Sequence, residues 1–296
     1  MLAGIRYVLV AILKYVAFKK NSMNYNYLIT RLLKEEKMQR IFVFISLGMF
    51  LLNAKVYAQG PPITTDKPIM LGAKTVILKT LTEVRSTEEG TFVNAPLMVH
   101  YLVTSNSLVA VHVPYTRYNF SSSEREDGSS LGDIQLLAKY QFYKKDGTGK
   151  TFRTVAKALH TLPTGEDINI MGMGLGAHQT YLGVVAGYES LQLGVSNELG
   201  YNQVFGKDFD ELRYKLGFGL PLLKPTYPVK KINLYFEYQN SWLVNRDEVL
   251  LLYAQGLQYA RGRLTIEASV QFPLYQNLPD NQRWNQSLFL GTRYIF

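Results

Sequence analysis

The sequence predicts an all-β protein, specifically a transmembrane, antiparallel, up-and-down β-barrel of about 12 strands. Three observations predict this fold. Most of the chain alternates apolar and polar side chains in short segments, the connections between these segments sort by length, and the chain stops on an aromatic residue within a strand pattern. Alternation with a period of two places one set of side chains on each face of a sheet.

The first 58 residues resemble material that is removed before the protein folds. Residues 38–58 combine Arg40, an apolar run from Ile41 to Leu52 and a small residue at Ala58. This pattern predicts a signal peptide cleaved after Ala58, and the run is shorter than the roughly 20 residues of a membrane-spanning helix. We interpret residues 1–37 as an upstream extension included in error, with a membrane-anchoring leader as the alternative.

Charge and composition bear on the partners of the chain. It has 32 Lys and Arg against 23 Asp and Glu, and no cysteine. Much of the basic excess lies in residues 1–58, so we predict no nucleic-acid partner. The lack of cysteine excludes disulfides and thiolate metal sites. Strands that alternate between a lipid face and a lumen face average out in hydropathy, which fits a mean hydropathy of −0.05 in a chain with 21 Tyr and 15 Phe.

The remaining chain divides into a short arm and a series of strands. Residues 59–71 are polar and rich in proline, and we predict that they form a periplasmic entry segment. Residues 72–296 form the predicted barrel domain, in which turn residues separate alternating segments. We place the strands at 73–85, 92–104, 107–119, 132–144, 151–162, 176–188, 191–203, 211–221, 230–242, 249–260, 263–274 and 286–296.

The alternation assigns each face of these strands to lipid or to the lumen. It is cleanest in 211–221, 230–242 and 263–274. In 230–242, for example, the apolar face holds Ile232, Leu234, Phe236, Tyr238 and Trp242, and the polar face holds Lys231, Asn233, Tyr235, Glu237, Gln239 and Ser241. An Arg or Lys on the lipid face near the midplane costs roughly 2–4 kcal/mol, so we assign the charged faces to the lumen.

The connections support a membrane barrel over a soluble sandwich. One alternate set comprises the turns 105–106, 144–150, 189–190, 223–230 and 261–262, of which three are tight. The other set includes 121–132, 163–174, 205–211 and 276–283, which are mostly longer and more polar. Short periplasmic turns alternating with longer outer loops are typical of outer-membrane barrels. A secreted all-β sandwich, the alternative fold, gives no reason for this sorting.

Three stretches carry a family resemblance: TTDKP at 64–68, LGDIQLLAKYQFY at 131–143 and AKALHTLPTGED at 156–167. They resemble the outer-membrane proteins of the putative MetA-pathway of phenol degradation family, often called transporters. The markers are the Gly132–Asp133 pair and the Pro163–Thr164–Gly165 run, and Lys67 stands where an Arg is common. The resemblance implies an outer-membrane barrel that moves small molecules, with aromatic ones suggested, and it implies no catalytic residue.

The last predicted strand ends on Tyr294 and Phe296, which share its apolar face. In a closed barrel this strand pairs with the first strand and leaves no open edge. By the same resemblance, Tyr294 and Phe296 belong to the C-terminal signal that the barrel-assembly machinery recognises.

The charged strand faces predict a lumen lining in which basic residues outnumber acidic ones. Its members are Lys79, Glu83, Arg85, Asp133, Lys139, Arg153, Lys157, Glu198, Arg213, Lys215, Lys231, Glu237, Arg263, Glu267 and Arg293. They form either a cross-strand network that holds a narrow barrel rigid or a basic lining that favours anionic solutes. His100 and His112 face each other across the turn at 105–106, as a hydrogen-bonded pair or as ligands of a metal.

The leading functional hypothesis is passive or facilitated passage of a small molecule across the outer membrane. We expect outer-membrane lipid, the barrel-assembly machinery and a small solute as partners, and no cofactor or resident metal. A structural or adhesive barrel that acts through its outer loops is one alternative. A membrane-embedded hydrolase is another, but no nucleophile, base and orienting group are recognisable together, so we predict no enzymatic activity.

Overall fold

A computed structural model describes residues 62–121, 126–168, 170, 173–223 and 230–296 of the chain. The predicted upstream extension, the signal peptide and its cleavage after Ala58 lie outside these residues and stay predictions. Within the described ranges, no helix has the length and hydropathy needed to cross a bilayer.

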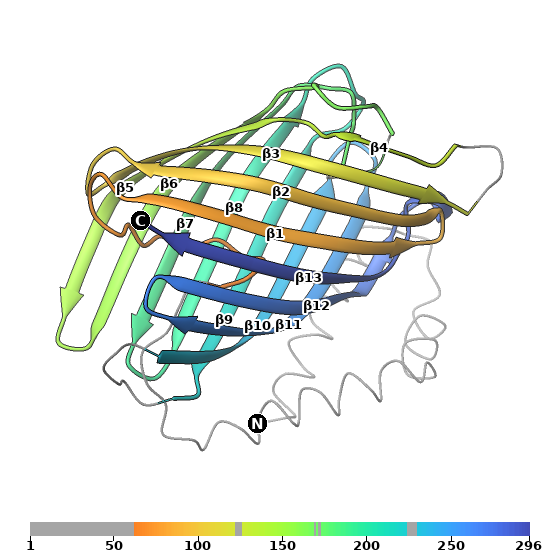
Figure 1. Cartoon of the computed structure of the whole chain (residues 1–296). Coiled ribbons are helices and arrows are strands. Elements are labelled where there is room, and N and C mark those ends of the chain that lie inside the picture. The colour runs from red at the N-terminus through yellow and green to blue at the C-terminus, as the bar shows by residue number, and fades with distance from the viewer. Residues whose placement is uncertain (1–61, 122–125, 169, 171–172, 224–229) are drawn as a thin grey trace, which may run out of the picture. The chain divides into compact units, whose positions relative to one another are not determined.

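The described residues form a closed antiparallel barrel of twelve long strands and one short extra strand (Figure 1). Each long strand pairs with the long strands before and after it, and β13 pairs with β1, so the predicted all-β up-and-down barrel is confirmed. The strands are β1 (Val76–Thr87), β2 (Gly90–Leu102), β3 (Ser107–Phe120), β4 (Gly128–Leu131), β5 (Gln135–Gly147), β6 (Lys150–Thr161), β7 (Gln179–Ser190), β8 (Gly194–Val204), β9 (Glu211–Pro221), β10 (Lys230–Leu243), β11 (Glu248–Arg261), β12 (Leu264–Asn277) and β13 (Trp284–Ile295), with a 3-10 turn η2 (Asp280–Gln282) before the last.

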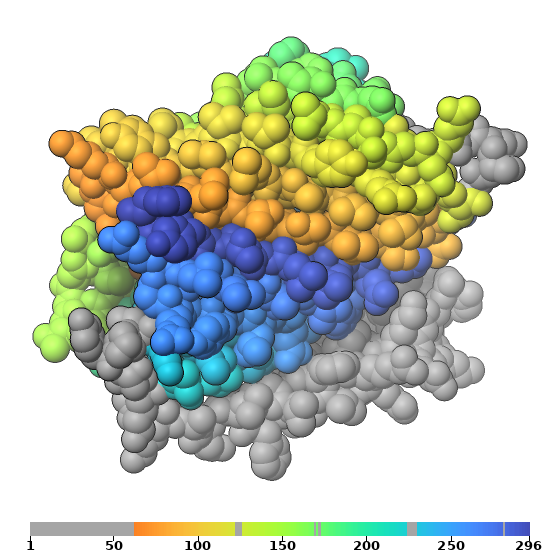
Figure 2. Space-filling model, viewed as in Figure 1, coloured from red at the N-terminus to blue at the C-terminus, as the bar shows by residue number. Residues whose placement is uncertain are grey.

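The C-terminal strand closes the barrel. β13 runs antiparallel to β1, with Ile295 opposite Ile77, and the Phe296 N–H donates to the Val76 carbonyl at 2.9 Å. Figure 2 shows the side chains of the two strands in contact along this seam. The predicted pairing of the last strand with the first is therefore confirmed, and it removes the open edges that unpaired strands would expose.

Two strands, β4 and β5, both pair with β3, each along a different part of it. The end of β3 pairs with β4 and its beginning pairs with β5, while residues 132–134 leave the ladder. The predicted strand 132–144 and outer loop 121–132 were therefore misplaced by a few residues, because the loop contains β4 and the strand begins at Gln135. Opposite the break lies Pro114, whose carbonyl accepts from Gly132 N at 2.8 Å but which has no N–H to extend the ladder.

The connections sort by length only in part, because the connection 222–229 at the C-terminal end has eight residues and the turn 88–89 at the opposite end has two. At the end of the barrel that carries the C-terminus, turns 148–149, 191–193 and 262–263 are short, whereas loops 162–178 and 205–210 at the opposite end are longer. The turn predicted at 144–150 is tighter than expected. β5 and β6 continue to a two-residue turn in which Gly149 adopts a φ of 66°, a conformation that favours glycine.

The outer wall has the surface of a membrane-spanning barrel. Exposed aromatic side chains gather toward both ends of the strands: Tyr101, Tyr140, Tyr188, Tyr259 and Tyr294 toward one end, and Tyr201, Phe205, Trp242 and Tyr275 toward the other. Exposed aliphatic side chains, including Leu97, Val99, Val109, Leu182, Val184, Leu257, Leu288 and Leu290, lie between them. An apolar band between aromatic girdles is characteristic of barrels in lipid.

The band predicts a depth-dependent cost for a charge. Leu290 lies in the middle of β13 and is 54% exposed, whereas Leu264 is the first residue of β12. We expect Leu290→Arg to lower the free energy of unfolding in lipid by about 2–4 kcal/mol, and Leu264→Arg by at most about 1 kcal/mol. Urea unfolding in lipid vesicles measures both, and equal costs would contradict the assigned membrane position.

Candidate functional site: the lumen and its plug

Residues 62–70 run inside the barrel, and we call them the plug. The segment 59–71 is predicted as a periplasmic entry segment; of its described residues, 62–70 are mostly buried against the lumen wall, whereas Leu71 is exposed. Ile63 is only 2% exposed and Thr65 only 7%. Glycines of the wall make the room, since a Cβ on Gly256 would lie 2.4 Å from Ile63 Cδ1 and one on Gly217 would lie 2.5 Å from Thr65 Oγ1.

Glu237 on β10 anchors the plug. Its carboxylate accepts from Thr64 N at 3.0 and 3.1 Å, Thr64 Oγ1 at 2.9 Å, Thr65 N at 2.8 Å and Thr65 Oγ1 at 2.6 Å. Glu237 is completely buried, and a buried carboxylate without such donors is strongly unfavourable. The lumen wall and the plug therefore satisfy each other, and this is the physical reason that the segment lies inside.

Ion pairs hold the next two residues of the plug. Asp66 binds Lys139 of β5 and lies 3.0 Å from Lys157 Nζ of β6, and Lys67 pairs with Glu189 of β7. Burial alone would raise the pKa of Asp66, but the attraction of the two lysine ammonium groups, which also donate to it, holds that pKa well below its ordinary value. The plug thus carries a fixed negative charge at Asp66.

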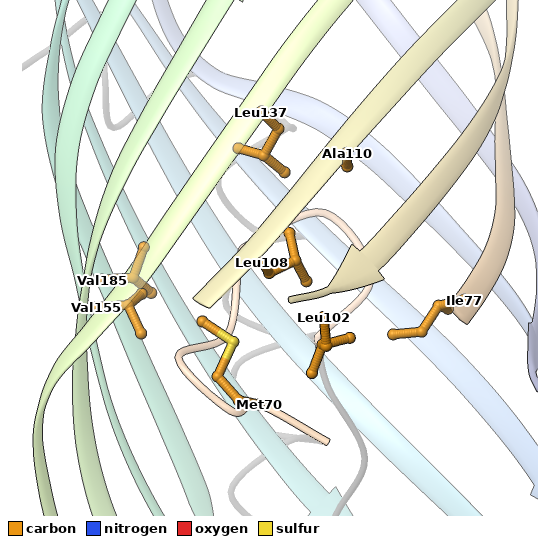
Figure 3. Close-up of a cluster of buried hydrophobic side chains, with 8 residues drawn as sticks. All are labelled: Met70, Ile77, Leu102, Leu108, Ala110, Leu137, Val155 and Val185. Atoms are coloured by element: carbon orange, nitrogen blue, oxygen red, sulfur yellow. The ribbon is translucent and has the colours of Figure 1, made fainter. Parts of the chain in front are cut away.

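The plug ends in an apolar cluster. Met70 packs with buried side chains from six strands: Ile77, Leu102, Leu108, Ala110, Leu137, Val155 and Val185 complete the cluster. Figure 3 shows Met70 between Leu102 and Leu108 on one side and Val155 and Val185 on the other. The plug is therefore held by polar contacts along most of its length and by an apolar contact where it joins the barrel.

A cavity of about 330 Å³ lies in the lumen beyond the plug. Two arginines with acidic and aromatic neighbours line it. Arg85 Nε lies 2.8 Å from Glu83 Oε1, and its guanidinium is 3.7 Å from the centroid of the Trp284 ring. Arg213 pairs with Glu211 and lies 5.2 Å from the Tyr181 ring. Since β1 and β9 are five positions apart in the twelve-strand order, the two arginines stand on well-separated parts of the wall.

Met173, Gly174 and Leu175 of the connection after β6 line the lumen cavity. A clamp at the start of this connection, at residues 164–165, fixes it to the β4–β5 break. Asp133 Oδ1 accepts from Gly165 N at 3.0 Å. Thr164 Oγ1 donates to the Gly132 carbonyl at 3.2 Å and accepts from Ile134 N at 2.9 Å. Farther along, buried Ile168, Ile170 and Met173 pack with Phe92. The sequence markers at 132–133 and 163–165 therefore form a structural clamp, and Asp133 belongs to it.

The other predicted lumen residues lie mostly where alternation placed them. Lys79 Nζ is 3.6 Å from Glu267 Oε1, Arg153 is 3.6 Å from Asp146, and Lys157 Nζ is 2.8 Å from Glu198 Oε1. Lys231 and Arg293 are partly buried on the lumen faces of β10 and β13. Arg263 is the exception. β12 begins one residue later, so Arg263 lies exposed in the turn before it rather than in the lumen.

Histidines form two stacked pairs. His100 and His112 face each other as predicted, with 3.3 Å between their Nε2 atoms and His112 Nδ1 3.3 Å from Gln135 Oε1. His160 and His178 stack with ring centroids 5.5 Å apart, a contact that the sequence did not indicate. No three His, Asp or Glu side chains gather as metal ligands in the part of the chain that the structure describes.

Sequence reasoning missed three acidic residues of the lumen, and they reduce its basic excess. Glu211 opens β9 on the same face as Arg213 and follows the alternation, so its parity could have identified it. Glu189 lies at the end of β7 next to a predicted turn. Asp66 enters with the plug, for which the sequence carries no periodic signal. Among the described residues, no acidic group lies within ion-pair distance of Lys215, Lys231 or Arg293.

Comparison with known proteins supports the architecture. No family model and no curated protein matches the chain. The structure is similar to a crystal structure of the COG4313 outer membrane channel from Pseudomonas putida F1, with 12% identity, 79% of this chain and 100% of that chain covered, and a TM-score of 0.58. The NanC porin (11% identity, 73% and 98% covered, TM-score 0.48) and the KdgM porin (9%, 74% and 99%, 0.45) are more distant. The first likeness shows the fold, and none of these matches bears on phenol degradation.

The anchoring of the plug predicts the effect of changing Glu237. Glu237→Gln keeps the shape but replaces one acceptor oxygen by a donor, so it weakens charge-assisted hydrogen bonds worth about 1.5–3 kcal/mol each. We expect backbone amides of residues 64–65 to exchange with deuterium about tenfold faster or more. Glu267→Gln is the matched control, because Glu267 is also buried in the lumen but binds Gln258 and lies near Lys79. Equal exchange in both variants would contradict the anchor.

Proposed function

We propose that the chain forms an outer-membrane channel for a small solute, and that the plug must leave its seat before the solute passes. The observation that carries the proposal is a polar segment seated in a polar lumen by hydrogen bonds and ion pairs. Water can replace these contacts when the plug leaves, at a net cost of about 0.5–1.5 kcal/mol for a neutral hydrogen bond and about 1.5–3 kcal/mol for one to a charged group. A plug held in this way is suited to reversible opening.

The solute class that the cavity suits is a small molecule with an anionic or aromatic group. The cavity volume of about 330 Å³ is at the lower end of the range for ligand pockets, about 300–1,000 Å³. Arg85 on the Trp284 ring and Arg213 near the Tyr181 ring offer positive charge beside aromatic surface. The acidic neighbours Glu83 and Glu211 moderate this preference, so the support for anions is weaker than the sequence alone indicated.

The proposal places the barrel in the outer membrane, with outer-membrane lipid around its apolar band. It also assigns Tyr294 and Phe296, whose rings meet edge to face with centroids 4.8 Å apart, to recognition by the barrel-assembly machinery. Neither the adhesive barrel nor the membrane-embedded hydrolase gains a specific supporting observation from the described residues.

A reversible disulfide between the plug and the wall tests the channel. A Cβ on Gly217 would lie 2.5 Å from Thr65 Oγ1, so cysteines at both positions come within disulfide range, and the chain has no other cysteine. In planar bilayers we expect the oxidised Thr65→Cys, Gly217→Cys variant to conduct no current and its reduced form to open.

Two controls make this measurement decisive. The single variant Gly217→Cys should conduct alike under oxidising and reducing conditions, because it has no partner thiol, and it carries the same added wall side chain that crowds Thr65 in the double variant. Heat-modifiable migration on gels establishes that each barrel is folded. Current through the oxidised double variant would show that the plug is not the gate. Silence of the folded reduced variant and of the unmodified protein would contradict a channel altogether.

A further inference from the structure

We propose that Lys215 of β9 couples the cavity to the plug, so that an anionic group entering the cavity draws the Lys215 ammonium away from the plug and promotes its release. This inference rests on the proposed function and deepens it. It assigns to the cavity a binding subsite for a carboxylate-like anion, formed by Lys215 and Arg213, and it makes the solute the signal for its own passage.

Lys215 contacts both the plug and the cavity, unlike the other residues that bind the plug. Its Nζ donates to the Thr64 carbonyl of the plug at 3.3 Å, and its side chain also lines the cavity. The other plug-binding residues described above, Glu237, Lys139, Lys157 and Glu189, do not line the cavity. Of these contacts, then, the one made by Lys215 alone can be reached directly by a molecule in the cavity.

The present partner of Lys215 is weak. A neutral carbonyl at 3.3 Å is a poorer acceptor for an ammonium group than a carboxylate, because hydrogen bonds between ionised partners are shorter and about twice as strong. Glu198 stands opposite Lys215 on β8. Glu198 is beyond ion-pair distance of Lys215: its Oε1 accepts from Lys157 Nζ at 2.8 Å and from Tyr181 Oη at 2.7 Å, and its Oε2 has no hydrogen-bond partner among the described residues. An incoming anion therefore offers Lys215 a better partner than it has in the closed barrel.

Arg213 completes the subsite from the same strand face. Residues two apart on a strand point to the same side, and Arg213 lines the cavity together with Lys215. Arg213 is paired with Glu211, so it adds hydrogen-bond donors and positive potential without being a free cation. A single carboxylate suits this arrangement better than a highly charged anion, because Glu211 lies close by.

The seated plug depends on the hydrogen bond that its Thr64 carbonyl accepts from Lys215. When Lys215 turns to the anion, the part-buried Thr64 carbonyl loses this donor, and the loss disfavours the seated state. The seated plug and the anion thus compete for one ammonium group. A ligand that binds the released state more tightly than the seated state shifts the population toward release, and the coupling is reciprocal.

Hydrogen–deuterium exchange of the plug tests the coupling without requiring any current. The probe is butyrate, and butyramide of similar shape is its neutral control, both applied to the folded full barrel in detergent at matched low ionic strength. We expect butyrate to speed the exchange of residues 64–65 by about fivefold or more, the lower range of typical couplings, and butyramide to leave it unchanged.

Substitution of Lys215 supplies the second arm. Lys215→Met keeps the length of the side chain but removes the ammonium, so we expect faster exchange of the plug without ligand and no response to butyrate. Lys231→Met is the matched control, because Lys231 is a lumen lysine that does not line the cavity. It should respond to butyrate like the unmodified protein.

Each outcome decides one proposal. A butyrate response that survives Lys215→Met, an equal response to butyramide, or no response in the unmodified barrel would overturn the coupling. If the disulfide-gated current is present while exchange ignores butyrate, the channel stands and the coupling fails. If butyrate speeds exchange through Lys215 but the reduced barrel carries no current, the ligand-sensitive plug stands and the channel proposal fails.

Discussion

Pairing of β13 with β1 is the constraint on which the rest of this structure depends. A bilayer offers no partner to an unpaired N–H or carbonyl, so a sheet with an apolar outer face is stable there only when its last strand bonds to its first. Closure of the barrel also determines which side chains face the lumen. Once alternate side chains meet lipid, the remaining side chains of all twelve strands point into one enclosed lumen, and most of these are polar.

A narrow polar lumen must satisfy its own groups. On the β10–β12 side this is done in part between strands, where fully buried Asn233 donates to Gln258 at 3.2 Å and Gln258 donates to Glu267 at 2.8 Å. Asn233 Oδ1 and Glu267 Oε1 have no hydrogen-bond partner among the described residues. Glu237 has no such partner in the contacts of the neighbouring strands, and the plug supplies its donors instead. The plug is thus required by the same rule that closes the barrel: buried polar groups need partners.

The sequence predicts features that follow the two-residue period of a strand, and it carries no signal for features without a period. Strand faces follow from a period of two, which is why β9 matches its predicted range 211–221 and why His100 meets His112. The plug has no period, and its anchor Glu237 is 172 residues from Thr65. The structure places Arg263 outside the predicted lumen lining for a different reason. A shift of one residue at the start of a strand moves a side chain from the lumen to a turn, and no local signal fixed that boundary.

The charges of the plug shape the lumen differently in its seated and released positions. Asp66 and Lys67 cancel, so release changes no net charge, but the two residues have partners in different places. Loss of Asp66 leaves Lys139 without its acidic partner and leaves Lys157 with Glu198 alone. Loss of Lys67 leaves Glu189 unpaired at the end of β7 beside the short turn 191–193. Release of the plug, as proposed above, would therefore leave positive charge within the lumen and negative charge at the end of the barrel that carries the C-terminus. In the proposed channel, the basic lumen attracts an anion, and the carboxylate at that end limits how tightly the path as a whole binds it. A solute path needs this balance, because a site that attracts a ligand must also let it leave.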